Sequence, residues 1–251
     1  MGQLIAITGK GGTGKTTVAA CLVRLLLERG ARPVLAVDAD PNASLAPLLG
    51  LRPGPTLSDI REEALAKKAE TTGVPKARAL EMKLEECVQE AGGFDLITMG
   101  RPEGPSCYCY VNNLLRSALK SLRANYRATV VDNEAGMEHL SRMNTDSVSC
   151  LVLVAEPTLP SARAAQRILD LAASLPVRVE RKVLVWNKVA PGGVPAKALK
   201  ILDQRRFDAT VFLPSDPDIA RLAALEENAL TAGPLPDAFG ALAQACDGAR
   251  R

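Results

Sequence analysis

The chain has 251 residues, of which 47% are apolar and 24% charged, and its formal net charge is only +3. This length is enough for one large hydrophobic core, and no shift in composition divides the chain, so we expect a single domain over residues 1–251. Acidic and basic residues are mixed, and aromatic residues make up only 3%, which argues against a nucleic-acid partner held on a platform of stacking rings.

The N-terminal sequence, MGQLIAITG, enters a strand-like run with no basic region ahead of an apolar core. No apolar run approaches the length needed to span a bilayer. We therefore expect a cytoplasmic protein without a membrane partner.

Short β-branched runs alternate with amphipathic helical patterns, which is typical of a doubly wound α/β fold, a mostly parallel sheet with helices on both faces. The expected strands are residues 4–7, 33–37, 95–99, 129–131, 151–154, 183–186 and 210–212. The expected helices are residues 16–28, 112–123, 161–175 and 216–225. Residues 56–93 are rich in Glu, Lys and Arg, and we interpret them as one or two inserted surface helices that end at Gly92-Gly93.

The first expected strand leads into GKGGTGKT, which matches G-x-x-x-x-G-K-[ST] and opens the helix over 16–28. In such a loop, glycines let backbone N–H groups surround phosphate oxygens, and the helix N-terminus adds its positive end. Lys15 would reach the β- and γ-phosphates, and the Thr16 hydroxyl would bind Mg²⁺. The strand and helix on either side favour a nucleotide site over a glycine-rich turn with a chance lysine. The predicted phosphate-binding set is Gly9, Gly11, Gly12, Thr13, Gly14, Lys15, Thr16 and Thr17.

Lys10 makes this loop resemble the deviant Walker A pattern, K-G-G-x-G-K-[ST]. That pattern belongs to the family of nitrogenase iron protein, the septum-site and plasmid-partition ATPases, and metal-insertion ATPases. The resemblance implies a homodimer in which Lys10 reaches the partner's phosphates and acts with Lys15 in catalysis, because a cation supplied in trans neutralises charge on the phosphoryl oxygens. Without the resemblance, Lys10 would be a solvent-facing lysine.

Carboxylates follow the second expected strand, at the edge where open α/β sheets bind ligands. The stretch DADPN, residues 38–42, is similar to the family's first switch. The resemblance implies that Asp40 orients the attacking water and that Asp38 lies near the Mg²⁺ ion. Asp40 or Asn42 could also cap a following helix, and the two roles can coexist.

Asp132, after the strand at 129–131, resembles the Walker B aspartate that holds Mg²⁺ through water. Gly136 lies in the second-switch position and resembles a γ-phosphate sensor or hinge. His139 is the only histidine in the sequence, and we give it no catalytic role.

The base site is expected at the ends of the last two strands. Asn187 resembles the family's adenine-reading asparagine, and Pro214-Ser215-Asp216 resembles its second adenine-contacting loop. A guanine reader would show N-K-x-D, whereas Ala190 stands at the Asp position, so ATP is favoured over GTP.

Cys107 and Cys109 lie one residue apart in a stretch that we expect to be a loop, before a helix that starts near Asn112. Two such thiols can point the same way, and a nearby helix N-terminus favours the thiolate. A two-fold dimer would bring four cysteines together, enough for a tetrahedral site or for a more open nickel site, although zinc also binds thiolates well. The other interpretation is a pair of buried, reduced cysteines.

The C-x-C pair with the downstream sequence VDNEAGMEH resembles the CooC-type nickel-insertion ATPases, which mature carbon monoxide dehydrogenase, with a close subgroup that serves acetyl-CoA synthase. The resemblance implies a nickel site at Cys107 and Cys109, and one of these two enzymes as the client. Two alternatives are a partition or septum-site ATPase that organises DNA or protein cargo, and an iron–sulfur electron donor. Residues 133–137 lack the cysteine of that donor class, and the C-terminal tail has few of the basic residues of a septum-site membrane helix.

Overall fold

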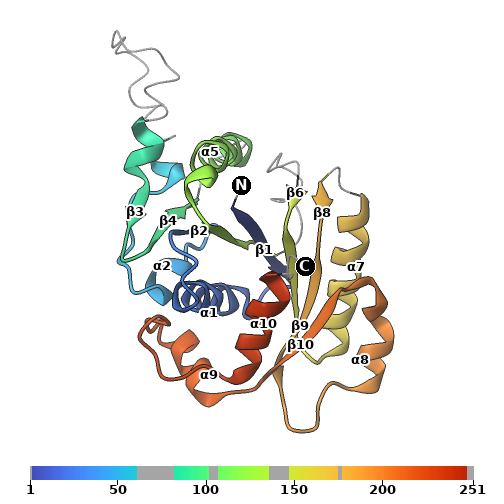
Figure 1. Ribbon diagram of the computed structural model, residues 1–251. Coiled ribbons are helices and arrows are strands. Elements are labelled where there is room, and N and C mark those ends of the chain that lie inside the picture. Colours follow the sequence, from blue (N-terminus) through green and yellow to red (C-terminus); the bar gives the residue numbers. More distant parts are fainter. Residues whose placement is uncertain (1, 61–81, 102–106, 136–146, 175–176, 248–251) are drawn as a thin grey trace.

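An eight-stranded sheet forms the centre of the computed structural model (Figure 1), which describes residues 2–60, 82–101, 107–135, 147–174 and 177–247, with the backbone alone for residues 107–110 and 112. The strand order is β10-β9-β7-β1-β5-β2-β4-β3, and within it β3 alone runs antiparallel to its neighbour. The strands are β1 (Gln3–Gly9), β2 (Val34–Ala39), β3 (Val88–Glu90), β4 (Phe94–Thr98), β5 (Ala128–Asn133), β7 (Cys150–Ala155), β9 (Lys182–Val189) and β10 (Ala209–Pro214). A separate parallel pair joins β6 (Ser147–Val148) to β8 (Arg178–Val179). The predicted α/β class and all seven predicted strands are confirmed.

Helices cover both faces of this sheet (Figure 1). They are α1 (Lys15–Glu28), α2 (Leu45–Leu48), α5 (Cys107–Leu122), α7 (Leu159–Ser174), α8 (Ala196–Ile201), α9 (Pro217–Ala224) and α10 (Asp237–Asp247), with short 3-10 turns η1 (Arg123–Asn125) and η2 (Gln204–Arg206). The four predicted helices correspond to α1, α5, α7 and α9. No helix in the described part of the chain has the length and apolar character that crossing a membrane requires.

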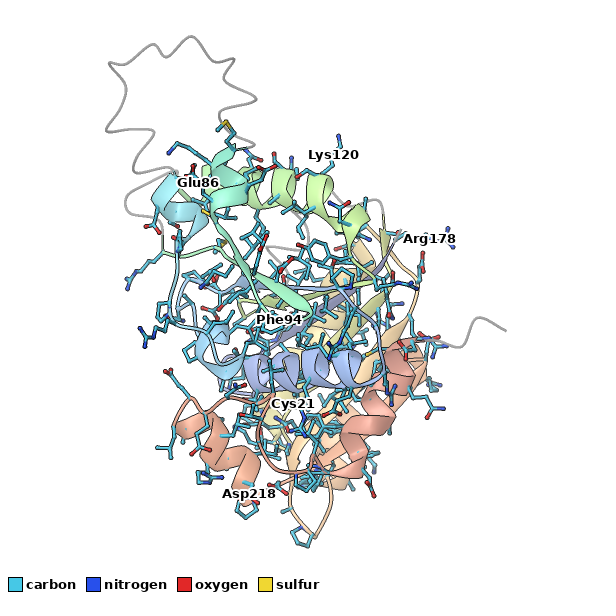
Figure 2. The ribbon with its side chains drawn as sticks, turned by 60° about the vertical axis from the view of Figure 1, so that its left-hand side comes forward. Cys21, Glu86, Phe94, Lys120, Arg178 and Asp218 are labelled. Carbon is cyan, nitrogen blue, oxygen red and sulfur yellow. The ribbon has the colours of Figure 1, made fainter. Side chains whose placement is uncertain are left out.

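Two hydrophobic clusters lie on opposite faces of the sheet, and alternation along β1 shows how they arise. Leu4 and Ala6 belong to the cluster that packs under α5, α7 and α8, whereas Ile5 and Ile7 belong to the one under α1, α2 and α10. Successive side chains of a strand point to opposite faces, so a strand covered on both sides is apolar at every position. Cys21 and Phe94, labelled in Figure 2, belong to the second cluster.

The segment over residues 56–93 differs from our prediction. Residues 57–60 and 82–86 are helical, residues 61–81 lie outside the described residues, and β3 follows at Val88–Glu90. Gly92-Gly93 ends no helix but closes the hairpin between β3 and β4, where the Ala91 N–H donates to the Phe94 carbonyl at 2.9 Å. A three-residue strand shows too little alternation to be recognised, and its pairing with β4 is what forms it.

Candidate functional site

The loop between β1 and α1 has the conformation that its glycines allow. A Cβ atom at Gly9 would lie 2.3 Å from the carbonyl oxygen of Val154, so only glycine fits against β7 there. Gly14 is the N-cap of α1 with a φ of 90°, and a Cβ on it would lie 2.5 Å from Nδ2 of Asn187. The backbone therefore turns sharply at both ends of the loop. These turns place the loop at the N-terminus of α1, so that the positive end of the helix faces the loop.

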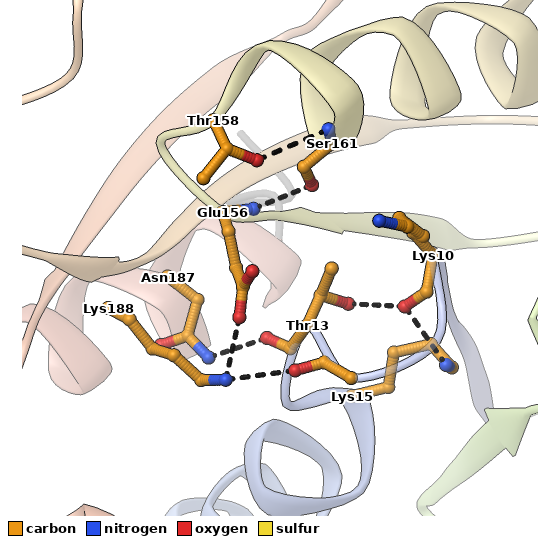
Figure 3. A network of polar contacts seen from close by, with 9 residues as sticks. Lys10, Thr13, Lys15, Glu156, Thr158, Ser161, Asn187 and Lys188 are labelled. Atoms are coloured by element: carbon orange, nitrogen blue, oxygen red, sulfur yellow. Dashed lines mark hydrogen bonds and ion pairs between the residues drawn. The ribbon is translucent and has the colours of Figure 1, made fainter.

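The carbonyl oxygen of Lys10 is the acceptor at the centre of the loop (Figure 3). Thr13 donates to it through Oγ1 at 2.8 Å and through its backbone N–H at 3.4 Å, and Lys15 Nζ lies at 3.5 Å. Lys15 is only 7% exposed, and this long contact is a weak partner for a buried ammonium group. Such a buried cation beside a helix N-terminus fits an anionic ligand such as a nucleotide phosphate.

Lys10 itself is exposed, and Figure 3 shows its side chain leaving the loop in a different direction from that of Lys15. An exposed side chain is what the predicted role across a dimer requires. That role stays a prediction.

Two neighbouring residues near the end of β9 donate hydrogen bonds to backbone carbonyls of the loop (Figure 3). Asn187 is 8% exposed, and its Nδ2 donates to the Thr13 carbonyl at 2.8 Å. Lys188 Nζ donates to the Gly12 carbonyl at 2.9 Å and forms an ion pair with Glu156 Oε1 at 2.6 Å. The amide nitrogen of Asn187 thus supports the phosphate loop, and its reading of adenine stays a prediction.

Asp38 and Asp132 are register partners on the neighbouring strands β2 and β5, and both are fully buried. Burial raises the pKa of Asp38 to about 6, although the N–H groups of Leu45 and Asp40 donate to its carboxylate. Burial, with repulsion from Asp38 as the next cause, raises the pKa of Asp132 to about 8. Two such carboxylates side by side favour a bound cation.

Asp132 fits the predicted magnesium site. Among the described residues, neither of its buried carboxylate oxygens has a hydrogen bond of good geometry. The Thr16 hydroxyl and the Lys15 ammonium group nevertheless lie near enough to lower its pKa in part. An unpartnered carboxylate beside a loop threonine is the donor set that a hydrated Mg²⁺ ion takes in a nucleotide site.

The predicted first switch contains a local turn. Asp40 Oδ1 accepts hydrogen bonds from the backbone N–H and the side-chain Nδ2 of Asn42, both at 2.9 Å. Neither residue caps α2, because Asp38 Oδ2 accepts from the Leu45 N–H at 2.8 Å at the start of that helix. The capping interpretation of Asp40 and Asn42 is therefore wrong, and Asp40 remains beside the cleft.

A cleft of about 560 Å³ brings most of the predicted residues together. Its lining includes Gly11, Gly12, Gly14, Lys15, Thr16, Thr17, Asp40, Asn187, Pro214 and Asp216. Asp216 Oδ1 also caps α9, accepting from the N–H groups of Asp218 at 2.9 Å and Ile219 at 3.0 Å. Gly136 and His139 lie outside the described residues.

Sequence reasoning missed the apolar wall of the cleft, which α2 and α9 provide through Leu48, Ile219, Ala220 and Ala223. It also missed Lys188, Glu134 and Glu226 at the same cleft. Apolar residues at helical spacing form the same sequence pattern whether they face a ligand or the hydrophobic core, so the sequence could not identify them as part of the cleft.

The cysteine pair lies in a helix and not in a preceding loop, because α5 begins at Cys107, five residues earlier than predicted. Cys107 and Cys109 therefore occupy positions i and i+2 of the first turn. Such positions are about 200° apart around a regular helix and do not share a face. Within the described side chains, no group of three His, Cys, Asp or Glu residues could hold a metal ion.

Comparisons with known proteins agree with this geometry. The family model described as the CobQ/CobB/MinD/ParA nucleotide binding domain matches residues 4–229. The carbon monoxide dehydrogenase accessory protein CooC of Rhodospirillum rubrum is 35% identical over 230 residues, covering 86% of this chain and 84% of the relative. An uncharacterized ATP-binding protein of Methanocaldococcus jannaschii is 40% identical over 193 residues, 75% of this chain and 76% of the relative. The cell-division ATPase MinD of Pyrococcus furiosus has a similar structure, with a TM-score of 0.71, 24% identity and 98% of both chains covered.

Proposed function

The chain belongs to the CobQ/CobB/MinD/ParA family of nucleotide-binding proteins as a CooC-type ATPase, and from this premise we propose that it carries nickel to a carbon monoxide dehydrogenase or acetyl-CoA synthase. The observation that supports this most is the 35% identity to an accessory protein of carbon monoxide dehydrogenase over most of both chains. The proposal has three parts, which are ATP use, dimer formation and metal binding.

ATP occupies the cleft in this proposal, with its phosphates inside the loop. Lys15 binds the phosphate oxygens, Asp132 and Thr16 hold Mg²⁺, and Asp40 orients the attacking water. The Mg²⁺ ion supplies positive charge that offsets the charge of the phosphates. Asn187, Pro214 and Asp216 surround the adenine.

Lys10 supplies the second cation, to the phosphates of a partner subunit. Its side chain is exposed and points in a different direction from that of Lys15 (Figure 3), which supports a role in trans. ATP then stabilises a face-to-face homodimer, and hydrolysis reopens it.

Nickel is bound by Cys107 and Cys109 from both subunits. The start of α5 places these residues on different sides of one helix, so a single subunit offers a poor pair of ligands. Two helix N-termini facing each other across a two-fold axis bring thiolates together from both chains, and the helix ends favour the thiolate form. Zinc would bind the same thiolates.

An anaerobic nickel titration in the presence of MgATP tests this site. We expect one nickel per dimer in the wild type, and none after replacement of both cysteines (Cys107→Ala with Cys109→Ala), with nucleotide binding retained. The control is Cys21→Ala, because burial raises the pKa of the Cys21 thiol to about 12 and makes it a poor ligand. A double variant that still binds one nickel per dimer would refute the assignment.

A second candidate function is a partition-type ATPase that binds DNA. Residues 159–208, from α7 through α8 and η2, carry ten basic and four acidic side chains, a net charge of +6, which leaves −3 for the rest of the chain. Titrating DNA at two salt concentrations decides, because binding through phosphates weakens steeply as salt rises. Salt-sensitive DNA binding that requires ATP would favour this candidate.

A further inference from the structure

One ion pair at the cleft has no part in the proposed chemistry. Lys188 follows Asn187 near the end of β9, and Glu156 directly follows β7, the strand between β9 and β1. The Lys188 side chain reaches across the end of β7 to the Gly12 carbonyl of the loop after β1, with the Glu156 carboxylate on its ammonium group (Figure 3). Three neighbouring strands are thus tied together at the phosphate loop.

Glu156 is itself held in place by the start of α7. Its backbone N–H donates to Ser161 Oγ at 2.9 Å, and the Ser161 N–H lies 3.3 Å from Thr158 Oγ1 (Figure 3). Ser161 is only 1% exposed. The Glu156 side chain therefore extends from a backbone position, directly after β7, that a hydrogen bond holds in place.

Lys188 has a backbone conformation that disfavours its own residue type. Its φ is 57°, in the left-handed region that residues with a side chain seldom adopt. Glycine would relieve this strain, so the backbone conformation does not explain a lysine at this position. The hydrogen bonds of the Lys188 ammonium group to Gly12 and Glu156 do explain it.

We propose that Lys188, held by Glu156, is a positioning residue that sets the phosphate loop for nucleotide binding. A peptide group is planar and trans, so fixing a carbonyl also fixes the N–H on the opposite side of the same plane. Lys188 fixes the Gly12–Thr13 plane, and Asn187 fixes the Thr13–Gly14 plane. The Thr13 N–H accordingly points across the loop, 3.4 Å from the Lys10 carbonyl.

The pair acts on binding more than on folding. The side chains of Lys188 and Glu156 are 53% and 30% exposed, so solvent screens their attraction and the pair adds little to global stability. A loop whose peptide groups are already fixed binds phosphates without the entropy loss of ordering those groups. This inference depends on the ATPase cleft alone and not on nickel, dimer formation or a client enzyme.

The test measures the Kd of MgADP by calorimetry on the metal-free wild type and variants, alongside the Tm without nucleotide. We expect Lys188→Met to weaken binding about tenfold with little change in Tm, and Lys188→Arg to recover part of the loss. Glu156→Gln should weaken binding less, and the double variant should bind no worse than Lys188→Met alone, because the two residues act as one unit. The matched control is Asp170→Asn on α7, which breaks the ion pair with Arg206 and should leave the Kd unchanged.

Lys188→Gly separates positioning from a purely structural role. Glycine suits the left-handed backbone, so its Tm should be unchanged or higher, whereas MgADP binding should fall as in Lys188→Met. A Kd within about twofold of the wild type for both Lys188→Met and Lys188→Gly would overturn the proposal. Additive effects of Glu156→Gln and Lys188→Met would equally refute the idea of one unit.

Discussion

Asp132 destabilises the metal-free fold through its buried carboxylate, and the same carboxylate is a ligand in the proposed magnesium site. Its carboxylate is fully buried beside Asp38, and burial together with repulsion from Asp38 raises its pKa to about 8. In the proposed function, a bound cation would offset the lost hydration. The sequence indicated this residue because Asp132 ends an apolar strand, at the sheet edge where ligands bind, and the resemblance to Walker B implied its magnesium role.

Replacing this carboxylate should stabilise the metal-free protein in a pH-dependent way. The pKa of Asp132 in the folded state, about 8, lies above the unfolded value of roughly 4, so its contribution to stability is complete below pH 4 and is lost as the pH rises toward 8. We therefore expect Asp132→Asn to exceed the wild type in urea stability by a margin that grows from pH 5.5 to pH 8.5. A margin that stays constant across this range would contradict a raised pKa of Asp132 in the folded protein. MgADP should stabilise the wild type more than the variant.

The two lysines of the phosphate loop should separate into different kinetic roles. Lys15 is buried beside the helix N-terminus, so Lys15→Gln should abolish nucleotide binding, whereas exposed Lys10 should matter only between subunits. We expect Lys10→Gln to bind MgADP like the wild type and to hydrolyse ATP roughly a hundredfold more slowly or worse. Assays of ATP turnover across a range of protein concentrations check this. Unchanged turnover in Lys10→Gln would contradict a role of Lys10 at the partner's phosphates.

At the scale of elements, the strands were predictable and several helices were not. Most of the predicted strands are short apolar runs that lie buried on both faces of the sheet, whereas β10 lies at the sheet edge and leaves Phe212 48% exposed. In contrast, α10 is rich in alanine and contains Gly240, and its position depends on Phe239 and Leu242 packing into the cluster under the sheet. α8 has only six residues and α2 only four, too short for a periodic pattern. The early start of α5 was missed because Gly104, Pro105 and Asn112 indicate a loop.

The C-terminal helix should be an integral part of the core and not a detachable tail. Leu242 of α10 is fully buried against the sheet, so Leu242→Ala should lower the free energy of unfolding by about 2–5 kcal/mol. Gln244→Ala, on the exposed side of the same helix, should change it by less than about 0.5 kcal/mol. Urea unfolding of both variants is the measurement, and equal, small effects would show that α10 adds little to the core.

At the scale of the whole molecule, the sequence indicated those candidate site residues that directly follow or end a predicted strand. The phosphate loop, Asp38, Asp132 and Asn187 each lie at the end of a strand, and parallel strands end at one edge, so their convergence follows from the fold class. The contact of Lys188 with Gly12 spans 176 positions of the chain and requires the strand order itself. No local pattern could reveal it. The cleft wall of α9 was hidden for a related reason, since an apolar face looks the same against a ligand and against a core.

The cysteine pair is the part of the proposed function that depends on dimer formation. Helix α5 begins at Cys107, where we predicted a loop, and its first turn separates Cys107 from Cys109 around the helix axis. In the proposed function, Lys10 and the two cysteines both depend on a face-to-face pair of chains. ATP binding, dimer formation and metal binding become one linked equilibrium in the proposed function.

Transfer of nickel to a client enzyme tests the proposed function most directly. The measurement is the recovery of carbon monoxide oxidation by nickel-free carbon monoxide dehydrogenase after addition of the nickel-loaded protein and MgATP. We predict that activity returns, and that it fails to return with Asp40→Ala or with the Cys107→Ala and Cys109→Ala double variant. Recovery that is equally fast with free nickel ions, or with the cysteine variant, would contradict a nickel-carrying ATPase.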